Sequence, residues 1–389
     1  MAYISSIANR WYVAQEGSYG QIPAITASNR IPAVKLTAQQ QREKSQRADK
    51  TGSRTWQGMP MGLRRQTTFD LTSYMRDWPD PSVLPSHDPL FQAALGGAGV
   101  LWAGNAANTG STVSTIVFVS PHNLNPGQAI TLGGEIRFIA AVADEQTVVL
   151  NAPFSAAPTL GAVLGQTVTY SPAIQLPSFS LFDYWDPSTA AQRVLCGAGV
   201  NEMTVKLNGD FHEFKFKGIA QDLIDGASFT AGQGGADTYP AEPAQTAFSY
   251  SPVPGNLGQV WLGVSPTQFL TVSSATIQLQ NDVDSRAREF GTILPQAIVP
   301  GQRTVSVSLE LFSQDDQATT ALYQAARQQS PVSMMFQLGQ VAGQLLGIYL
   351  QSVVPSVPQF DDSDRRLVWN FTDTRAQGTA ENEIVVAFG

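Results

Sequence analysis

The sequence has few charged residues, almost no cysteine and no long apolar run. Charged residues make up 14% of its 389 residues, whereas hydrophobic residues make up 43%. This balance supports a sizeable core but leaves a surface of uncharged polar groups, which suits packing against other subunits. A loop-rich β protein would have the same composition, so both interpretations stay open.

The single cysteine, Cys196, excludes an intrachain disulfide and a multi-cysteine zinc site. It is expected to behave as a small buried apolar residue. No run of about 18 apolar residues occurs, so no membrane association is expected. The first residues lack the basic and apolar regions of a secretion signal. We therefore expect a protein made in a cytoplasm, which leaves it only as part of an assembly.

Residues suited to catalysis or metal binding are few and badly placed. His212 and Glu213 are adjacent in an expected strand and should point to opposite faces. The acidic residues of 361–364 lack the ligand spacing and the glycine of a calcium loop. No nucleophile elbow and no phosphate-binding loop appear. The sequence therefore predicts a protein that is not an enzyme and that has no cofactor and no metal ion.

The net charge is −8 and the pI is near 4.9. A specific nucleic-acid reader normally carries a basic face, because phosphate contacts supply much of its affinity. The chain as a whole does not fit that class. A weakly acidic surface would do the opposite and keep DNA from adhering.

What the sequence does have is an internal repeat. An alternating run after a basic residue occurs at 64–74 and again at 301–312. Each run is followed by a short helical segment reading Leu-aromatic-Gln-Ala-Ala, at 90–94 and at 322–326, and the spacing is nearly the same in both copies. Such a repeat indicates a duplicated domain.

The repeat divides the chain into domains. We expect the first β domain to comprise residues 1–104 and 173–226, and the second to comprise 259–389. Residues 105–172 have no counterpart in the second half and contain β-rich runs separated by Gly- and Pro-containing turns. They are expected to form a small all-β domain inserted at an exposed loop. Residues 227–258 are rich in Gly, Ala and Pro and are interpreted as a linker.

Two long loops occupy equivalent positions, at about 42–63 and 284–300. In each, a charged portion precedes an apolar one. Loops of this length are usually functional or disordered, and this pattern fits an arm that becomes ordered on a neighbouring subunit. A solvated, flexible loop is the alternative. The residues expected to make the contacts are Arg42, Lys44, Arg47, Lys50, Arg54, Trp56, Met59, Arg286, Arg288 and Phe290.

Taken in order, these segments resemble the tail tube proteins of long-tailed bacteriophages. The resemblance is carried by 9–14, 31–36 and 68–71 with 88–94 in the first half. In the second half the runs at 284–291 and 305–312 carry it. It covers nearly the whole chain except the inserted block. None of these motifs is catalytic, and each alone has little specificity.

The resemblance implies a mainly β fold with two tandem tail-tube-type β-sandwich or barrel domains, each flanked by one short α-helix. In the family, subunits form rings whose inner strands join into a barrel around a channel, and the rings stack into a tube. Most members have one such domain and form hexameric rings. A chain with two copies resembles the duplicated variants, in which a homotrimer makes a pseudo-hexameric ring, and the long loops would reach the adjacent ring.

The implied location is the phage virion, with a role in genome delivery. The implied partners are other copies of the chain, other tail proteins at the tube ends, and a tape-measure protein and double-stranded DNA that occupy the channel without specific binding. An alternative is a baseplate or host-surface-binding tail protein that uses the inserted domain.

Strand alternation adds a prediction about the channel. In the expected strands, apolar residues alternate with polar ones, which gives each strand an apolar and a polar face. We expect the polar face to line the channel and to be slightly acidic, so that duplex DNA passes without tight contacts. Exposure of this face on the outside is the alternative. The channel-lining candidates are Lys35, Thr37, Gln39, Asp70, Gln278, Gln280, Asp282, Ser306, Ser308 and Glu310.

Overall fold

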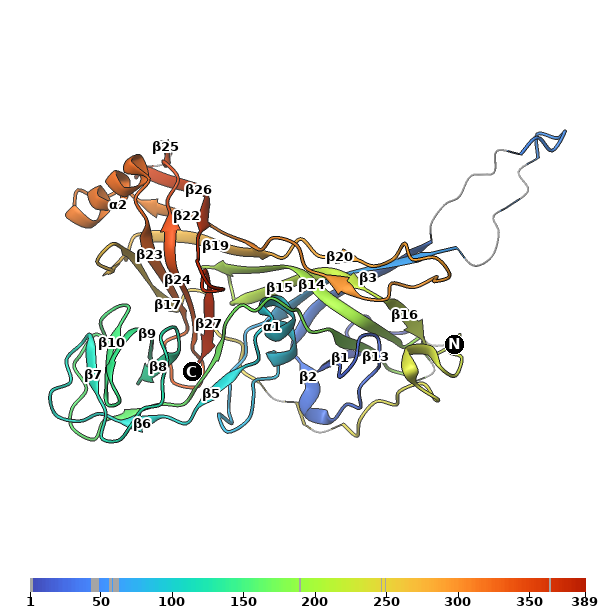
Figure 1. The fold of residues 1–389 in the computed structure, drawn as a ribbon, viewed down its shortest axis with the longest axis horizontal. Helices are drawn as coiled ribbons and strands as arrows, with labels where there is room; N and C mark the ends of the chain where they lie inside the picture. Colours follow the sequence, from blue (N-terminus) through green and yellow to red (C-terminus); the bar gives the residue numbers. More distant parts are fainter. Residues whose placement is uncertain are drawn as a thin grey trace.

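The computed structural model describes residues 3–42, 49–55, 58, 63–188, 190–245, 247–248, 250–363 and 365–389. Over these residues the chain is mainly β, with a 19-stranded sheet, a four-stranded sheet, two two-stranded sheets and two α-helices. Figure 1 shows strongly curled sheets with one helix against each half. The predicted fold class, mainly β with two sandwich domains and a small inserted β domain, is confirmed.

The elements form three groups, and the first group resumes along the chain after the middle one. The first half contains β1 (Asn9–Gln15), β2 (Arg30–Ile31), β3 (Ala33–Arg42), β4 (Arg65–Tyr74), α1 (Asp88–Leu95), β13 (Phe179–Trp185), β14 (Arg193–Leu207), β15 (Glu213–Ala220) and β16 (Asp222–Asp225). The middle contains β5 (Val100–Trp102), β6 (Asn105–Ala106), β7 (Thr115–Val117), β8 (Ala129–Leu132), β9 (Glu135–Asp144), β10 (Thr147–Leu150), β11 (Val163–Leu164) and β12 (Thr167–Tyr170). The second half contains β17 (Gly258–Gly263), β18 (Thr267–Gln268), β19 (Val272–Gln280), β20 (Asp284–Ser285), β21 (Ile298–Val299), β22 (Thr304–Phe312), α2 (Gln317–Gln328), β23 (Val332–Leu338), β24 (Leu346–Val354), β25 (Gln359–Asp361), β26 (Val368–Ala376) and β27 (Val385–Phe388).

The two halves repeat one strand order. In the first half, the strands pair antiparallel in the order β3–β4–β15–β14. In the second half the order is β19–β22–β26–β25. The two sets join edge to edge, because the C-terminal part of β14 pairs with β19. We call this continuous run of strands from β3 to β25 the inner sheet.

Each half also has an outer sheet. The first is ordered β1–β13–β14–β16 and the second β17–β23–β24–β27. Strand β14 belongs to both sheets of its half, and it changes partners near Gly197. Gly197 has φ +60, a conformation that favours glycine because other side chains would clash with the backbone.

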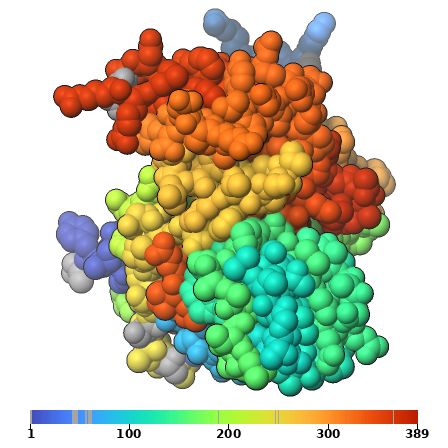
Figure 2. Space-filling model, turned by 90° about the vertical axis from the view of Figure 1, so that its left-hand side faces the viewer, coloured from blue at the N-terminus to red at the C-terminus, as the bar shows by residue number. Residues whose placement is uncertain are grey.

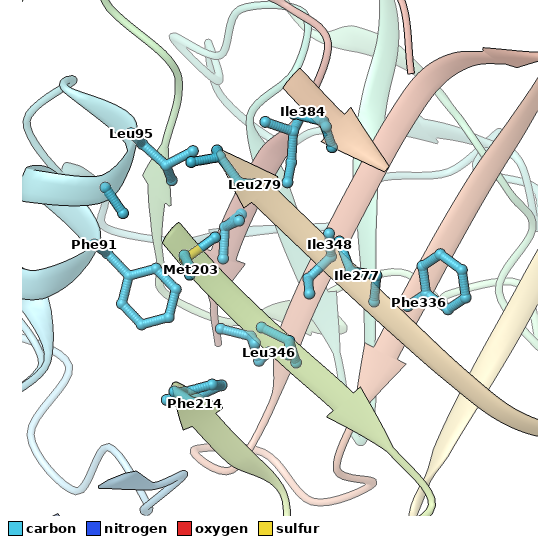
Figure 3. Packing of buried hydrophobic residues seen from close by; sticks show 14 of the residues in the cluster. Phe91, Leu95, Met203, Phe214, Ile277, Leu279, Phe336, Leu346, Ile348 and Ile384 are labelled. Carbon is cyan, nitrogen blue, oxygen red and sulfur yellow. The ribbon is translucent and has the colours of Figure 1, made fainter. Parts of the chain in front are cut away.

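One hydrophobic core runs through both halves, and Phe91 of α1 lies at its centre. The Phe91 ring is fully buried and lies 5.2 Å, between centroids, from Phe214 of β15 and 5.2 Å from Phe388 of β27. Figure 3 shows Phe91 and Leu95 pointing from α1 toward Met203 and the strands of the second half. The halves are therefore joined by packing as well as by strand pairing.

The second helix, α2, packs on its own half in the same way, but its aromatic residues are more exposed to solvent. Asp316 caps its N-terminus by accepting a hydrogen bond from Thr319 N at 2.8 Å. Tyr323, which corresponds to Phe91 in the repeat, lies 5.4 Å from the ring of Trp369 on β26 and 6.0 Å from Phe360 on β25. Phe360 remains 57% exposed. The same packing unit is therefore covered in the first half and partly open in the second.

The inserted block has its own core, which includes Ile116, Phe118 and Val148 around the sheet β7–β10–β9–β8. It is fastened to the outer sheet of the second half by Arg137, which is fully buried. The Arg137 guanidinium pairs with Glu135 at 2.6 Å and donates to Gln337 Oε1 at 3.1 Å. Figure 2 shows the block as a green and teal lobe against the second half.

The insert is expected over 105–172, and its last two strands, β11 and β12, belong to different sheets. Only β11 pairs within the block, with β6. β12 pairs with β5 and with β27, in the large sheet. The reason is that Val168 and Tyr170 pack into the main core rather than into that of the insert.

The segment interpreted as a linker, 227–258, lies over the outer sheet of the first half. Glu242 accepts hydrogen bonds from Arg10 at 2.5 and 2.8 Å and from Tyr12 Oη at 3.0 Å. The guanidinium of Arg30 lies 4.1 Å from the ring centroid of Phe248. Although its composition is typical of a flexible linker, the segment contains side chains that hold it against β1 and β2.

These contacts predict unequal losses of stability for equivalent residues. Phe91→Ala should lower the free energy of unfolding by about 3–5 kcal/mol, because it removes a fully buried ring. Tyr323→Ala should cost clearly less, because Tyr323 is only half-buried. Urea denaturation followed by circular dichroism measures both, and equal losses would contradict the central position of Phe91.

Candidate assembly surfaces

The polar face of the inner sheet is continuous across both halves. Cross-strand partners in an antiparallel sheet point to the same side. One row across the sheet runs Thr37, Asp70, Lys217, Glu202, Gln280 and Thr304, with each residue opposite the next. A parallel row runs Lys35, Thr72, Lys215, Thr204, Gln278, Ser306 and Arg375. The opposite face of these strands is the apolar core.

Nine of the ten channel candidates share this face. On β3, β19 and β22, Lys35, Thr37, Gln39, Gln280, Ser308 and Glu310 are exposed. Asp70, Gln278 and Ser306 are half-buried beside them.

Asp282 does not share the face, because it lies past the end of β19 at φ +49. Between the end of β19 and Asp282 lies the buried Asn281, which donates its amide to Ala94 O at 2.9 Å and to Val200 O at 3.0 Å.

The sequence reasoning missed the charged residues of β14 and β15. Lys206, Lys215 and Lys217 lie on the polar face together with Glu202 and Glu213. Lys215 Nζ lies 3.2 Å from Asp70 Oδ2, and Lys217 Nζ lies 2.9 Å from Glu202 Oε1. The face therefore carries both signs, whereas a slightly acidic face was expected. The sequence feature that could have revealed these lysines is the alternation of Phe214 and Phe216 with Lys215 and Lys217.

The inner sheet has two free edges within the part of the chain that the structure describes. β3 pairs only with β4, and β25 pairs only with β26. Unpaired strand edges invite pairing with another chain. The exposed ring of Phe360 lies on β25, where it stacks 5.3 Å from Trp369. The free edge of β25 therefore carries an exposed aromatic side chain beside unpaired backbone groups, which makes it a candidate surface for pairing with another chain.

The two long loops leave the inner sheet at the same end. The second folds back on the first half, since Arg65 N donates to Ile293 O at 3.1 Å and Arg64 donates to the carbonyl oxygens of Arg288 and Glu289 at 3.3 Å. Figure 1 shows the β20 segment running beside β3 toward the end where the β3–β4 loop projects.

The predicted loop residues divide into three groups. Lys44, Arg47, Trp56 and Met59 lie outside the described residues. Lys50 and Arg54 are exposed near the tip of the first loop, and Arg42 is exposed where β3 ends. In the second loop, Arg286 pairs with Glu289, Arg288 is exposed and the Phe290 side chain is fully exposed. A groove between the loops brings together the basic residues Arg42, Arg64, Arg65, Arg286 and Arg288.

A comparison with known protein families matches residues 9–388 to the phage tail tube protein family. The chain belongs to that family. The match spans both halves and the inserted block, so the resemblance drawn from the sequence is confirmed. A search of curated proteins found no match. Tail tube proteins are structural components of the virion.

Among the described residues, no group of three or more His, Cys, Asp or Glu side chains is arranged to hold a metal ion. No helix in the described ranges is long and apolar enough to cross a membrane.

The polar face can be tested by labelling, because the one native cysteine is unreactive. Cys196 is fully buried, and burial raises the pKa of its thiol to about 12. In the unassembled protein, Ser308→Cys should react rapidly with a maleimide, whereas Leu309→Cys, on the apolar face of the same strand, should be protected. Mass spectrometry reads both, and rapid labelling of Leu309→Cys would contradict the assignment of faces.

Proposed function

We propose that the chain is the major tail tube subunit and that it polymerises into stacked rings whose channel conveys the phage genome. Family membership supports a structural tail protein. The observation that carries the finer proposal is the β14–β19 joint, which joins two equivalent strand sets edge to edge within one chain. Repeating this joint between chains would close the inner sheet into a barrel. With two sets in each chain, three chains would make a ring of six.

The register proposed for the joint between chains is taken from the internal joint. Val205 of β14 lies opposite Ile277 of β19, and both are buried. Trp369 of β26 and Phe214 of β15 occupy equivalent positions in the two halves. Phe360 pairs with Trp369, and Val205 pairs with Phe214, so Phe360 is the equivalent of Val205. By the same reasoning, Ala38 of β3 corresponds to Ile277.

Ring closure would therefore place Phe360 of one chain opposite Ala38 of the next. It would also place Gln359 opposite Gln39. Burial of the exposed 57% of Phe360 would contribute about 1–2 kcal/mol at each junction, roughly half the value for a wholly exposed ring. This gain accounts for an aromatic side chain that is left exposed in the isolated chain.

An engineered disulfide tests this register. Gln39→Cys with Gln359→Cys should cross-link neighbouring chains on oxidation, because paired strands bring Cα atoms within disulfide range. Three chains should join into a closed species that a non-reducing gel and mass photometry identify. The matched control is Gln41→Cys with Gln359→Cys, which is out of register by two residues. Equal cross-linking of both pairs, or none in assembled material, would contradict the proposed joint.

The loops are proposed to lock successive rings. Residues 42–65 carry an excess of Lys and Arg, whereas the whole chain has a net charge of −8. The exposed residues near the tip of this loop, Lys50 and Arg54, are therefore suited to an acidic surface of the next ring. The inserted domain, which packs on an outer sheet, would lie on the outside of the tube.

Charge reversal in the first loop tests the locking role. Lys50→Glu with Arg54→Glu should leave folding and ring closure intact but prevent growth of long tubes, because the loop would repel an acidic neighbour. Arg327→Glu, an exposed site on α2, is the control and should leave tubes unchanged. Negative-stain electron microscopy measures tube length. Tubes of ordinary length from the loop variant would contradict the role of these charges.

A further inference from the structure

Besides the expected Lys35, the polar face carries lysines on its middle strands, and their ammonium groups would attract DNA in a channel wall. Lys215 and Lys217 come from β15, in the middle of the first strand set, and both are partly exposed. An ammonium group at such a position binds phosphate and releases counterions, which adds affinity for duplex DNA. A wall with free lysines would therefore slow a passing duplex.

Each lysine is held by a carboxylate from a neighbouring strand. Asp70 of β4 pairs with Lys215, and Glu202 of β14 pairs with Lys217. The register places Lys217 directly between Asp70 and Glu202 across the three strands. The hydrogen bond to Glu202 also raises the pKa of Lys217. Lys217 thus lies between negative charges on both sides, whereas Lys215 lies between Thr72 and Thr204 in the register and pairs with Asp70 alone.

Stability does not account for this arrangement. Exposed ion pairs usually contribute about 0–1 kcal/mol, because water screens them and ordering the side chains costs entropy. Two hydroxyl or amide pairs, such as those elsewhere on the face, would serve the fold equally well. The pairs do change the local electrostatic field, since each carboxylate cancels the charge that a phosphate would meet.

We propose that Asp70 and Glu202 mask Lys215 and Lys217 from duplex DNA, so that the channel wall does not retain the genome. This inference rests on the proposed function, in which the polar face lines the channel. It assigns the two carboxylates a role in releasing a ligand rather than in binding one.

The test removes the two carboxylates as Asp70→Asn with Glu202→Gln. In unassembled protein, where the face is open, binding of a short fluorescent duplex is measured by anisotropy over a range of salt concentrations. Two unmasked lysines that each contact one phosphate should steepen the slope of log K against log salt by about 1.8. The variant should also bind more tightly at low salt.

Two controls isolate the cause. Glu145→Gln with Asp237→Asn changes the net charge equally at exposed sites away from the face and should leave the slope near that of the native chain. Adding Lys215→Gln and Lys217→Gln to the test variant should restore native binding. If the test variant binds like the charge-matched control, or if removal of the lysines has no effect, masking is refuted.

Electron microscopy of the same variants separates this idea from the proposed function. A native chain that never forms hollow tubes would contradict the function itself. Native tubes combined with unchanged DNA binding in the test variant would contradict only the masking.

Discussion

The pairing of β14 with β19 is the interaction on which the rest of the structure depends. It makes one curled sheet from two strand sets, with one face apolar and the other polar. Because the pairing uses one edge of each set, it leaves β3 and β25 as the ends of the sheet. The packing of Phe91 against Phe388 of the other half reinforces the joint from the core side.

The halves share an inner design but cover their outer sheets differently. In the first half, Tyr12, Phe182 and Tyr184 are covered by chain segments that include Tyr239 of the segment 227–258. In the second half, Trp261, Met335 and Tyr349 are covered by Ile136 and Phe138 of the inserted block. Equivalent apolar surfaces have therefore been covered by unrelated pieces of chain. The inner strands of the two halves are therefore repeated, whereas the segments that cover the outer sheets differ between the halves.

Much of this could be predicted from the sequence, because repetition and alternation are local signals. The alternation at 304–312 gave both the strand and its faces, and Leu322 with Tyr323 marked the helix. The partners of β12 and the position of the segment 227–258 could not be predicted. They depend on contacts between residues far apart in the sequence, such as Arg10 and Glu242. The lysines of β15 could have been found, since the alternation that buries Phe214 and Phe216 places them on the polar face.

The central claim is that the polar face of a sheet shared by three chains encloses the channel. Cryo-electron microscopy of assembled tubes tests it most directly. The account predicts rings in which threefold symmetry relates the chains and sixfold symmetry holds only for the inner strands, with Ser308 and Glu310 facing the bore. A ring of six chains, or a tube with Glu310 on its outer surface, would contradict it.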